Sequence, residues 1–202
     1  MLLINNLSFF RNDNLVFENL NLSLGNGQIT QIRGKNGSGK TTFLKVILNI
    51  LKSKTGEIFW EGQNVKKNIF NFYNQITYIA DHNTSNRKLS VLDNIKFWKG
   101  LSSSNLSDDD TFLLLETFSL KKYLNTQTMY LSSGEVKKLE LLRLILEQKK
   151  IWILDEPYNH LDDSSIEIMN QTFVDHTNND GIILFASHYN PVFDKLEILE
   201  FN

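Results

Sequence analysis

A glycine-rich run near the start of the chain has the residue types needed to bind phosphate. The pattern G-x-x-x-x-G-K-[ST] is matched by Gly34, Lys35, Asn36, Gly37, Ser38, Gly39, Lys40, Thr41 and Thr42. Its glycines let successive backbone N–H groups turn inward around an anion. Lys40 has the charge and length to reach β- and γ-phosphates, and the Thr41 hydroxyl can bind Mg²⁺. These residues predict a nucleotide site rather than a plain glycine-rich turn.

Two acidic residues and a histidine in the second half could complete this chemistry. Asp155 ends the apolar run 151–154, where a carboxylate can hold Mg²⁺ directly or through water. Glu156 could polarise a water for in-line attack on the γ-phosphate. His188 follows another apolar run, 182–185, and would bring an imidazole to the same phosphate. Taken alone, the two acids could belong to a solvated loop and the histidine could be structural.

A third candidate, for a second anion-binding site, lies at the start of the helix predicted over 133–149. The stretch consists of Leu131, Ser132, Ser133, Gly134 and Glu135. A helix N-terminus offers free N–H groups and here also a hydroxyl to an anion. The alternative is an ordinary cap by Ser132, with Glu135 forming a capping box.

The elements that must position these residues predict an α/β fold. The alternating run 28–33 predicts a half-buried strand before the phosphate loop, and the apolar run 43–48 predicts a helix after it. Further strands are expected at 2–10, 15–24, 57–61, 76–79, 151–154, 182–185 and 196–201, and helices at 90–99, 107–120, 133–149 and 164–176. Because strand signals are absent between residues 79 and 151 and then resume, we expect one domain over 1–202 with a helical subdomain inserted at about 84–135.

Composition narrows the classes of protein. A chain of 202 residues is long enough for one domain with a real core. The net charge of −2 gives no electrostatic case for nucleic-acid binding, and the lack of cysteine excludes disulfides and thiolate metal sites. Without a signal peptide or an apolar run of membrane-spanning length, a cytoplasmic chain is expected. Any role at a membrane would then require a partner.

Taken together, these motifs resemble those of the ABC ATPases. The stretch 131–135 resembles their L-S-G-G-Q signature, and 151–156 resembles their Walker B strand with Glu156 at the catalytic glutamate. Residues 159–162 look like the D-loop, which includes Asp162, and His188 looks like the switch histidine. The resemblance covers nearly the whole chain. It implies a P-loop NTPase core with an antiparallel β subdomain and an inserted helical subdomain.

The resemblance also implies a mechanism that needs two copies. In this family two domains close head to tail on two ATP molecules. Each γ-phosphate would lie between Lys40 of one copy and the signature residues Ser132 and Gly134 of the other. Glu156 would drive hydrolysis, His188 would stabilise the transition state, and the motion would pass to an integral membrane subunit.

Two positions depart from the family pattern. Arg11 aligns where an aromatic ring usually stacks on adenine, although a guanidinium can also stack on a purine. Asp81 occupies the Q-loop position, where a glutamine usually contacts Mg²⁺ and the attacking water. The carboxylate differs from that glutamine in charge and in reach.

Other stretches resemble the A subunits of cytochrome c maturation transporters, the haem-exporter ATPases. These are Arg11 and the stretches 60–63, 92–97 and 152–158. This resemblance implies a homodimer with an integral B-type permease subunit at the cytoplasmic face of a bacterial inner membrane. It implies haem export or release of haem from a chaperone. No direct haem site is expected, because none of the histidines lies in a C-x-x-C-H motif.

Three alternatives remain open. The chain could be the ATPase of another small exporter, for a peptide, drug or lipid. It could be a soluble cassette protein acting on ribosomes or DNA, although it has neither a second cassette nor a long coiled-coil arm. It could be a regulatory module with little turnover, which Lys40, Asp155, Glu156 and His188 argue against.

Overall fold

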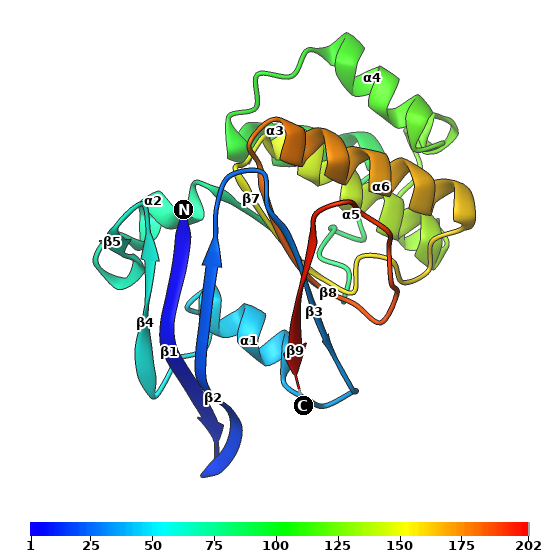
Figure 1. Cartoon of the computed structure of the whole chain (residues 1–202). Coiled ribbons are helices and arrows are strands. Elements are labelled where there is room, and N and C mark those ends of the chain that lie inside the picture. The colour runs from blue at the N-terminus through cyan, green and yellow to red at the C-terminus, as the bar shows by residue number, and fades with distance from the viewer. Residues whose placement is uncertain (202) are drawn as a thin grey trace.

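Two β-sheets of different kinds organise the chain (Figure 1). The computed structural model describes residues 1–201. The first sheet has the order β2-β1-β4-β5 and is antiparallel, with β1 Leu2–Arg11, β2 Asn14–Leu24, β4 Thr55–Trp60 and β5 Gln63–Asn64. The second has the order β6-β7-β8-β3-β9 and is parallel, with β3 Ile29–Gly34, β6 Ile76–Ile79, β7 Ile151–Asp155, β8 Ile182–Ala186 and β9 Leu196–Phe201.

The helices cover the parallel sheet on both faces. Helix α1 lies on the face toward the antiparallel sheet, and α3, α5 and α6 lie on the other (Figure 1). The helices are α1 Lys40–Ile47, α2 Ile69–Tyr73, α3 Val91–Ser102, α4 Asp108–Thr117, α5 Ser133–Glu147 and α6 Asp163–Asn178. Short 3₁₀ turns occupy Val65–Lys67, Lys121–Tyr123 and Thr128–Tyr130. Helices α3, α4 and α5 all fall between β6 and β7, where the sequence predicts helices.

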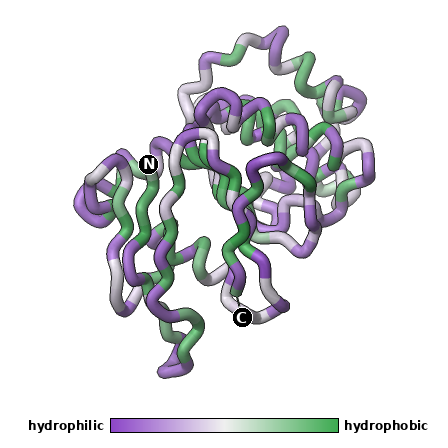
Figure 2. The backbone as a smooth tube through the Cα atoms, viewed as in Figure 1, coloured by the Kyte–Doolittle hydropathy of each residue, from purple (hydrophilic) through white to green (hydrophobic). Residues whose placement is uncertain are grey.

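The parallel sheet separates two hydrophobic cores. Along β7, Ile151 and Ile153 face the core shared with α1 and the antiparallel sheet, whereas Trp152 and Leu154 face the core under α5 and α6. This alternation follows from the two-residue period of a strand. Figure 2 shows hydrophobic segments running along the strands and a hydrophilic tip on the β1–β2 hairpin. Burial on both faces therefore explains why β7 and β8 read as continuous apolar runs.

One prediction about burial is wrong. The run 28–33 alternates polar and apolar residues, yet Thr30 and Gln31 are only 1% and 0% exposed. The physical reason is that β3 pairs with β8 and β9 on its two sides, while the two hydrophobic cores cover its two faces, with Ile32 in one core and Ile29 in the other. The Gln31 amide finds partners inside, because its Nε2 donates to the carbonyl oxygens of Ser187 at 3.1 Å and Tyr189 at 2.8 Å. This buried amide fixes the loop that carries His188.

Among residues 1–201, no helix is both long enough and apolar enough to cross a membrane.

Candidate functional site

The phosphate loop connects β3 to α1 and depends on its glycines. Gly39, the N-terminal cap of α1, has a φ of 104°, in the left-handed region that favours glycine. A Cβ there would also lie 2.6 Å from Cγ1 of Val16. A Cβ on Gly34 would meet the Ser38 Oγ at 2.6 Å and the Phe201 carbonyl oxygen. The loop therefore packs between β2 and β9 and has no room for larger residues at these two positions.

Lys40 lies at the centre of this loop and is only 7% exposed. Its Nζ donates to the carbonyl oxygens of Gly34 at 2.8 Å and Lys35 at 3.2 Å. It also lies 3.2 Å from His188 Nε2, and that nitrogen is 2.6 Å from Asn36 Oδ1. The structure thus brings His188 against the phosphate loop, as the sequence predicts.

Thr41 and Asp155 meet at the first turn of α1. The Thr41 hydroxyl donates to Asp155 Oδ1 at 3.0 Å, and Asp155 is 2% exposed. Burial raises the pKa of Asp155, while the bond from Thr41 lowers it and the charge of Asp81 raises it. One hydroxyl and one carboxylate side by side fit Mg²⁺, which takes few protein ligands and completes its shell with phosphate and water.

Glu156 follows β7 on a strained turn beside this pair. Its φ of 45° lies in the left-handed region, which is uncommon for a residue other than glycine. The bond from Glu156 N to the Ala186 carbonyl oxygen, 2.9 Å, holds this turn against β8. The Glu156 carboxylate accepts from the backbone N–H of His188 at 3.3 Å, and its Oε1 lies 3.6 Å from His188 Nε2. The two predicted catalytic residues are therefore neighbours.

A cavity of about 650 Å³ unites most of the candidates, and it is lined by Arg11, Val16, Asn36, Gly37, Gly39, Lys40, Thr41, Thr42, Lys45, Ile50, Leu51, Asp81 and Glu156. Arg11 Nη2 donates to the Thr42 hydroxyl at 3.2 Å, so Arg11 lies at the edge of the loop. Asp81 Oδ1 accepts from Asn159 Nδ2 at 3.2 Å. The two departures from the family pattern thus both face the nucleotide cavity.

The signature stretch does not line this cavity. Ser132 caps α5: its Oγ accepts from Glu135 N at 3.3 Å, and Glu135 Oε2 accepts from Ser132 N at 2.8 Å. The capping box considered as the alternative is therefore present. Gly134 has a separate constraint, because a Cβ there would lie 2.8 Å from the His160 carbonyl oxygen. The signature therefore does not contribute to the cavity beside the phosphate loop of its own chain.

The segment 159–162 links the signature helix to the site. Asp162 caps α6 by accepting from Ser165 N at 2.9 Å, and it pairs with Lys138 Nζ of α5 at 3.0 Å. Hydrogen bonds from Ser165 and Lys138 lower the pKa of Asp162. Asn159 of this segment binds Asp81, which lines the cavity, and the His160 carbonyl oxygen lies against Gly134 of the signature.

Sequence reasoning missed two buried polar residues near the site. Gln31 holds the His188 loop, as described above. Lys137 of α5 is 2% exposed, and its Nζ has no hydrogen-bond partner among the described residues. Burial lowers its pKa, whereas the carboxylates of Asp81, Glu140, Asp155 and Glu156 favour the charged form. The signal for Lys137 was its helical spacing from Leu141 and Leu144, which places it on the inward face of α5.

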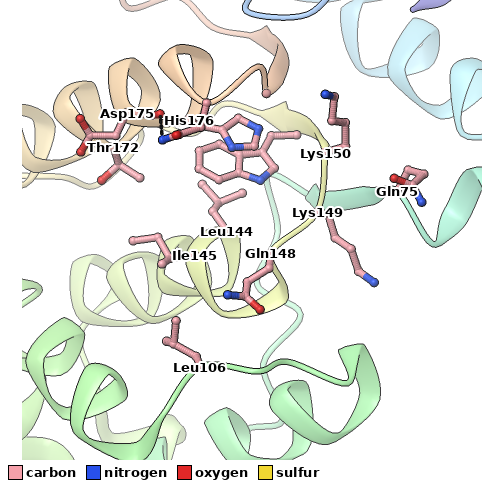
Figure 3. Close-up of a pocket in the computed structure, with 13 residues that line it drawn as sticks. Gln75, Leu106, Leu144, Ile145, Gln148, Lys149, Lys150, Thr172, Asp175 and His176 are labelled. Atoms are coloured by element: carbon pink, nitrogen blue, oxygen red, sulfur yellow. Dashed lines mark hydrogen bonds between the residues drawn. The ribbon is translucent and has the colours of Figure 1, made fainter.

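A second cavity, of about 560 Å³, lies at the other end of the parallel strands, beside the residues that precede β6, β7 and β8 (Figure 3). It opens between the C-terminal ends of α5 and α6, beside Lys149, Lys150 and His176. The rings of His176 and Trp152 stack there with centroids 3.6 Å apart. No residue of the phosphate loop lines this cavity, so it is not the nucleotide site.

Comparison with known proteins identifies the family to which this chain is similar. The family model for ABC transporters matches residues 17–159. The cytochrome c biogenesis ATP-binding export protein CcmA of Aliivibrio fischeri is 30% identical over 98% of this chain and 97% of its own length. The protein of the same name from Idiomarina loihiensis is 35% identical over 90% of this chain and 83% of its own length.

Solved structures show the same fold. A Pyrococcus furiosus protein described as an ABC transporter ATP-binding protein superposes with a TM-score of 0.85 at 25% identity, over 99% of this chain and 96% of its own. The ATP-binding cassette MJ0796, as a post-hydrolysis dimer with ADP and Pi, gives a TM-score of 0.79 at 18% identity, over 94% and 88%. The predicted P-loop NTPase core with its antiparallel sheet is confirmed. The chain belongs to the ABC transporter family, as an ATP-binding subunit that hydrolyses ATP.

Proposed function

We propose that this subunit powers a transporter for c-type cytochrome biogenesis, either by exporting haem or by releasing it from a chaperone. The observation that carries the proposal is the similarity to cytochrome c biogenesis export proteins along 98% of the chain. The proposal includes no haem site and no nucleic-acid partner in this chain.

Within one chain, the residues of the cavity would divide the work of hydrolysis. Backbone N–H groups of 34–42 and the Lys40 ammonium bind the β- and γ-phosphates. Thr41 and Asp155 hold Mg²⁺, which would neutralise phosphate charge. Glu156 takes a proton from the attacking water. His188, held between Asn36 and Glu156, stabilises charge on the γ-phosphate, and Arg11 stacks on the adenine.

The signature would act on the ATP of a second copy. Its residues, Leu131–Glu135, do not line the cavity of their own chain, and the solved MJ0796 cassette is a dimer. In a head-to-tail homodimer, Ser132 and Gly134 would close over the γ-phosphate bound to the other copy's Lys40. The free N–H groups at the start of α5 suit this anion.

Residues 1–202 would form one ATP-binding domain, with a helical subdomain at about 84–135. This domain would bind an integral permease subunit of the cytochrome c maturation B type. It would lie peripherally at the cytoplasmic face of the bacterial inner membrane.

A deletion of the gene tests the proposed pathway. We expect c-type cytochromes, measured by haem staining of membranes, to be lost and then restored by the wild-type gene but not by Glu156→Gln. Co-purification from native membranes in mild detergent should recover the permease with either protein. Normal cytochrome levels in the deletion strain would rule out this pathway.

A further inference from the structure

A buried carboxylate on α5 holds the segment Asp81–Ser85, which follows β6. Glu140 is 2% exposed. Its Oε1 accepts from Thr84 N at 2.8 Å and from Ser85 N, and its Oε2 accepts from the Thr84 hydroxyl at 2.7 Å. Two consecutive backbone N–H groups and one hydroxyl therefore end on a single carboxylate. Such charge-assisted bonds are stronger than neutral ones, and a buried carboxylate that loses them is costly.

Arg143, one turn further along α5, completes this contact. Its Nη1 donates to the Thr84 hydroxyl at 2.9 Å and to Glu140 Oε2 at 3.3 Å. Its Nε and Nη2 donate to Glu147 Oε1 at 3.0 and 2.9 Å, and the guanidinium lies 5.0 Å from the Trp98 ring centroid. The charge of Glu140 is thus paired as well as hydrogen-bonded, so the contact has one well-defined geometry.

Glu140 joins the segment Asp81–Ser85 to helix α5, and in the proposed two-copy arrangement each of these elements contacts a different ATP molecule. The segment begins at Asp81, which lines the cavity of its own chain. Helix α5 begins at the signature cap, Ser132, which does not line that cavity. A helix is a rigid connection over the two turns that separate Ser132 from Glu140.

We propose that Glu140 is a positioning residue that fixes Asp81–Ser85 to α5. Asp81 at one nucleotide and the signature that reaches the other nucleotide then move as one unit. The inference rests on the proposed two-copy function. Without Glu140, each chain would still bind ATP on its own phosphate loop, but the signature would be placed less accurately on the second copy.

The test measures the ATP concentration for half-maximal dimer formation, by light scattering, in a Glu156→Gln parent. Adding Glu140→Ala should raise this concentration about tenfold, within the usual range of coupling between sites. Glu140→Gln, which keeps the shape and one acceptor oxygen, should raise it less. The affinity of the monomer for a fluorescent ATP analogue should change less than about twofold, because the phosphate loop is untouched.

Glu147→Ala is the matched control. Glu147 lies on the same helix and binds the same Arg143, but its Oε2 accepts from Thr77 of β6 at 2.8 Å and not from the segment. The ATP concentration for half-maximal dimer formation of the Glu147→Ala variant should stay within about twofold of that of the parent. An equal shift in both variants, or none for Glu140→Ala, would overturn the role of Glu140 and leave the dimer intact. A parent that fails to dimerise would overturn the proposed two-copy function and this inference with it.

Discussion

Lys137 is a buried ammonium on α5 whose charge interacts with four carboxylates. Burial of Lys137 without a hydrogen bond is unfavourable, and the negative charges of Asp81, Glu140, Asp155 and Glu156 offset part of that cost. A fixed positive charge in this position also repels a divalent cation. Lys137 therefore bears on how tightly the site binds Mg²⁺.

Replacing Lys137 by Met should strengthen Mg²⁺ binding, because the side chain keeps its volume and loses its charge. At fixed ATP, we expect the Mg²⁺ concentration for half-maximal thermal stabilisation to fall on the order of tenfold. Lys67→Met, at an exposed position, is the control and should leave the Mg²⁺ titration unchanged. A Lys137→Met titration that overlays the wild type would show that the ammonium does not act on the metal.

Replacing Asp81 by Gln should leave the ATPase rate unchanged or raised. Glutamine still offers a carbonyl oxygen to Asn159, and it removes the negative charge that raises the pKa of Asp155. Steady-state hydrolysis of MgATP measures the effect. A collapse of kcat would show that the Asp81 carboxylate has a dedicated role.

At the residue scale, the sequence predicts which residues form the loop between β3 and α1, because they lie close together in the chain, from Gly34 to Thr42. The sequence does not predict the interactions of Gln31 and Lys137, because the groups that they contact belong to elements far away in the chain. The loop after β8 binds Gln31, and the ends of β6 and β7 surround Lys137. No local pattern reports such contacts.

Among the elements, β7 and α6 are joined by an aromatic contact that depends on pH. His176 of α6 stacks on Trp152 of β7 with an interplanar angle of 6°. Burial lowers the pKa of His176 to about 4. Because the folded pKa lies below the unfolded one, the unfolded chain binds the proton first as the pH falls. The contribution of the neutral His176 to the free energy of unfolding is fully present above about pH 6.5. It is lost as the pH falls from 6.5 through about 4.

Replacing His176 by Gln should flatten this part of the pH dependence. At pH 7 the variant should lose about 1 kcal/mol of unfolding free energy, because the stack is gone. The wild type should lose on the order of 2 kcal/mol more than the variant between pH 7 and 4, allowing for partial exposure of the ring. Urea denaturation at several pH values measures both. Parallel pH curves for the two proteins would contradict the burial of a neutral His176.

The sequence predicts the boundaries of an element where its hydrophobic pattern continues over many residues or forms an uninterrupted apolar run. Helix α5, with fifteen residues, and the apolar strands β7 and β8 lie close to their predicted ranges. Strand β5 and helix α2 were not predicted, because two and five residues are too short to show a period. The polar residues of β3 favour a half-buried strand, because such residues usually face solvent; in the structure both faces of β3 are covered.

At the scale of the whole molecule, the proposed function requires two copies of the chain to assemble around ATP. Glu156→Gln should bind ATP without hydrolysing it and accumulate as a closed dimer, because the amide cannot take the proton from water. Size-exclusion chromatography with light scattering at saturating ATP should show twice the monomer mass. Adding Lys40→Ala to this variant should restore the monomer. If Glu156→Gln alone stayed monomeric, the head-to-tail arrangement would be wrong for this protein.

Strand β3, which precedes the phosphate loop, is synthesised long before the two strands with which it pairs. Both neighbours of β3, the strands β8 and β9, come from residues 182–201, about 150 residues further along the chain. At 5–20 residues per second, a ribosome would need about 8–30 s to supply them. Until then β3, with its apolar residues Ile29 and Ile32, has no pairing partner, and the loop lacks the wall formed by Phe201. Nascent chains should therefore need protection from aggregation, and they should gain affinity for ATP only when residues 182–201 have left the ribosome.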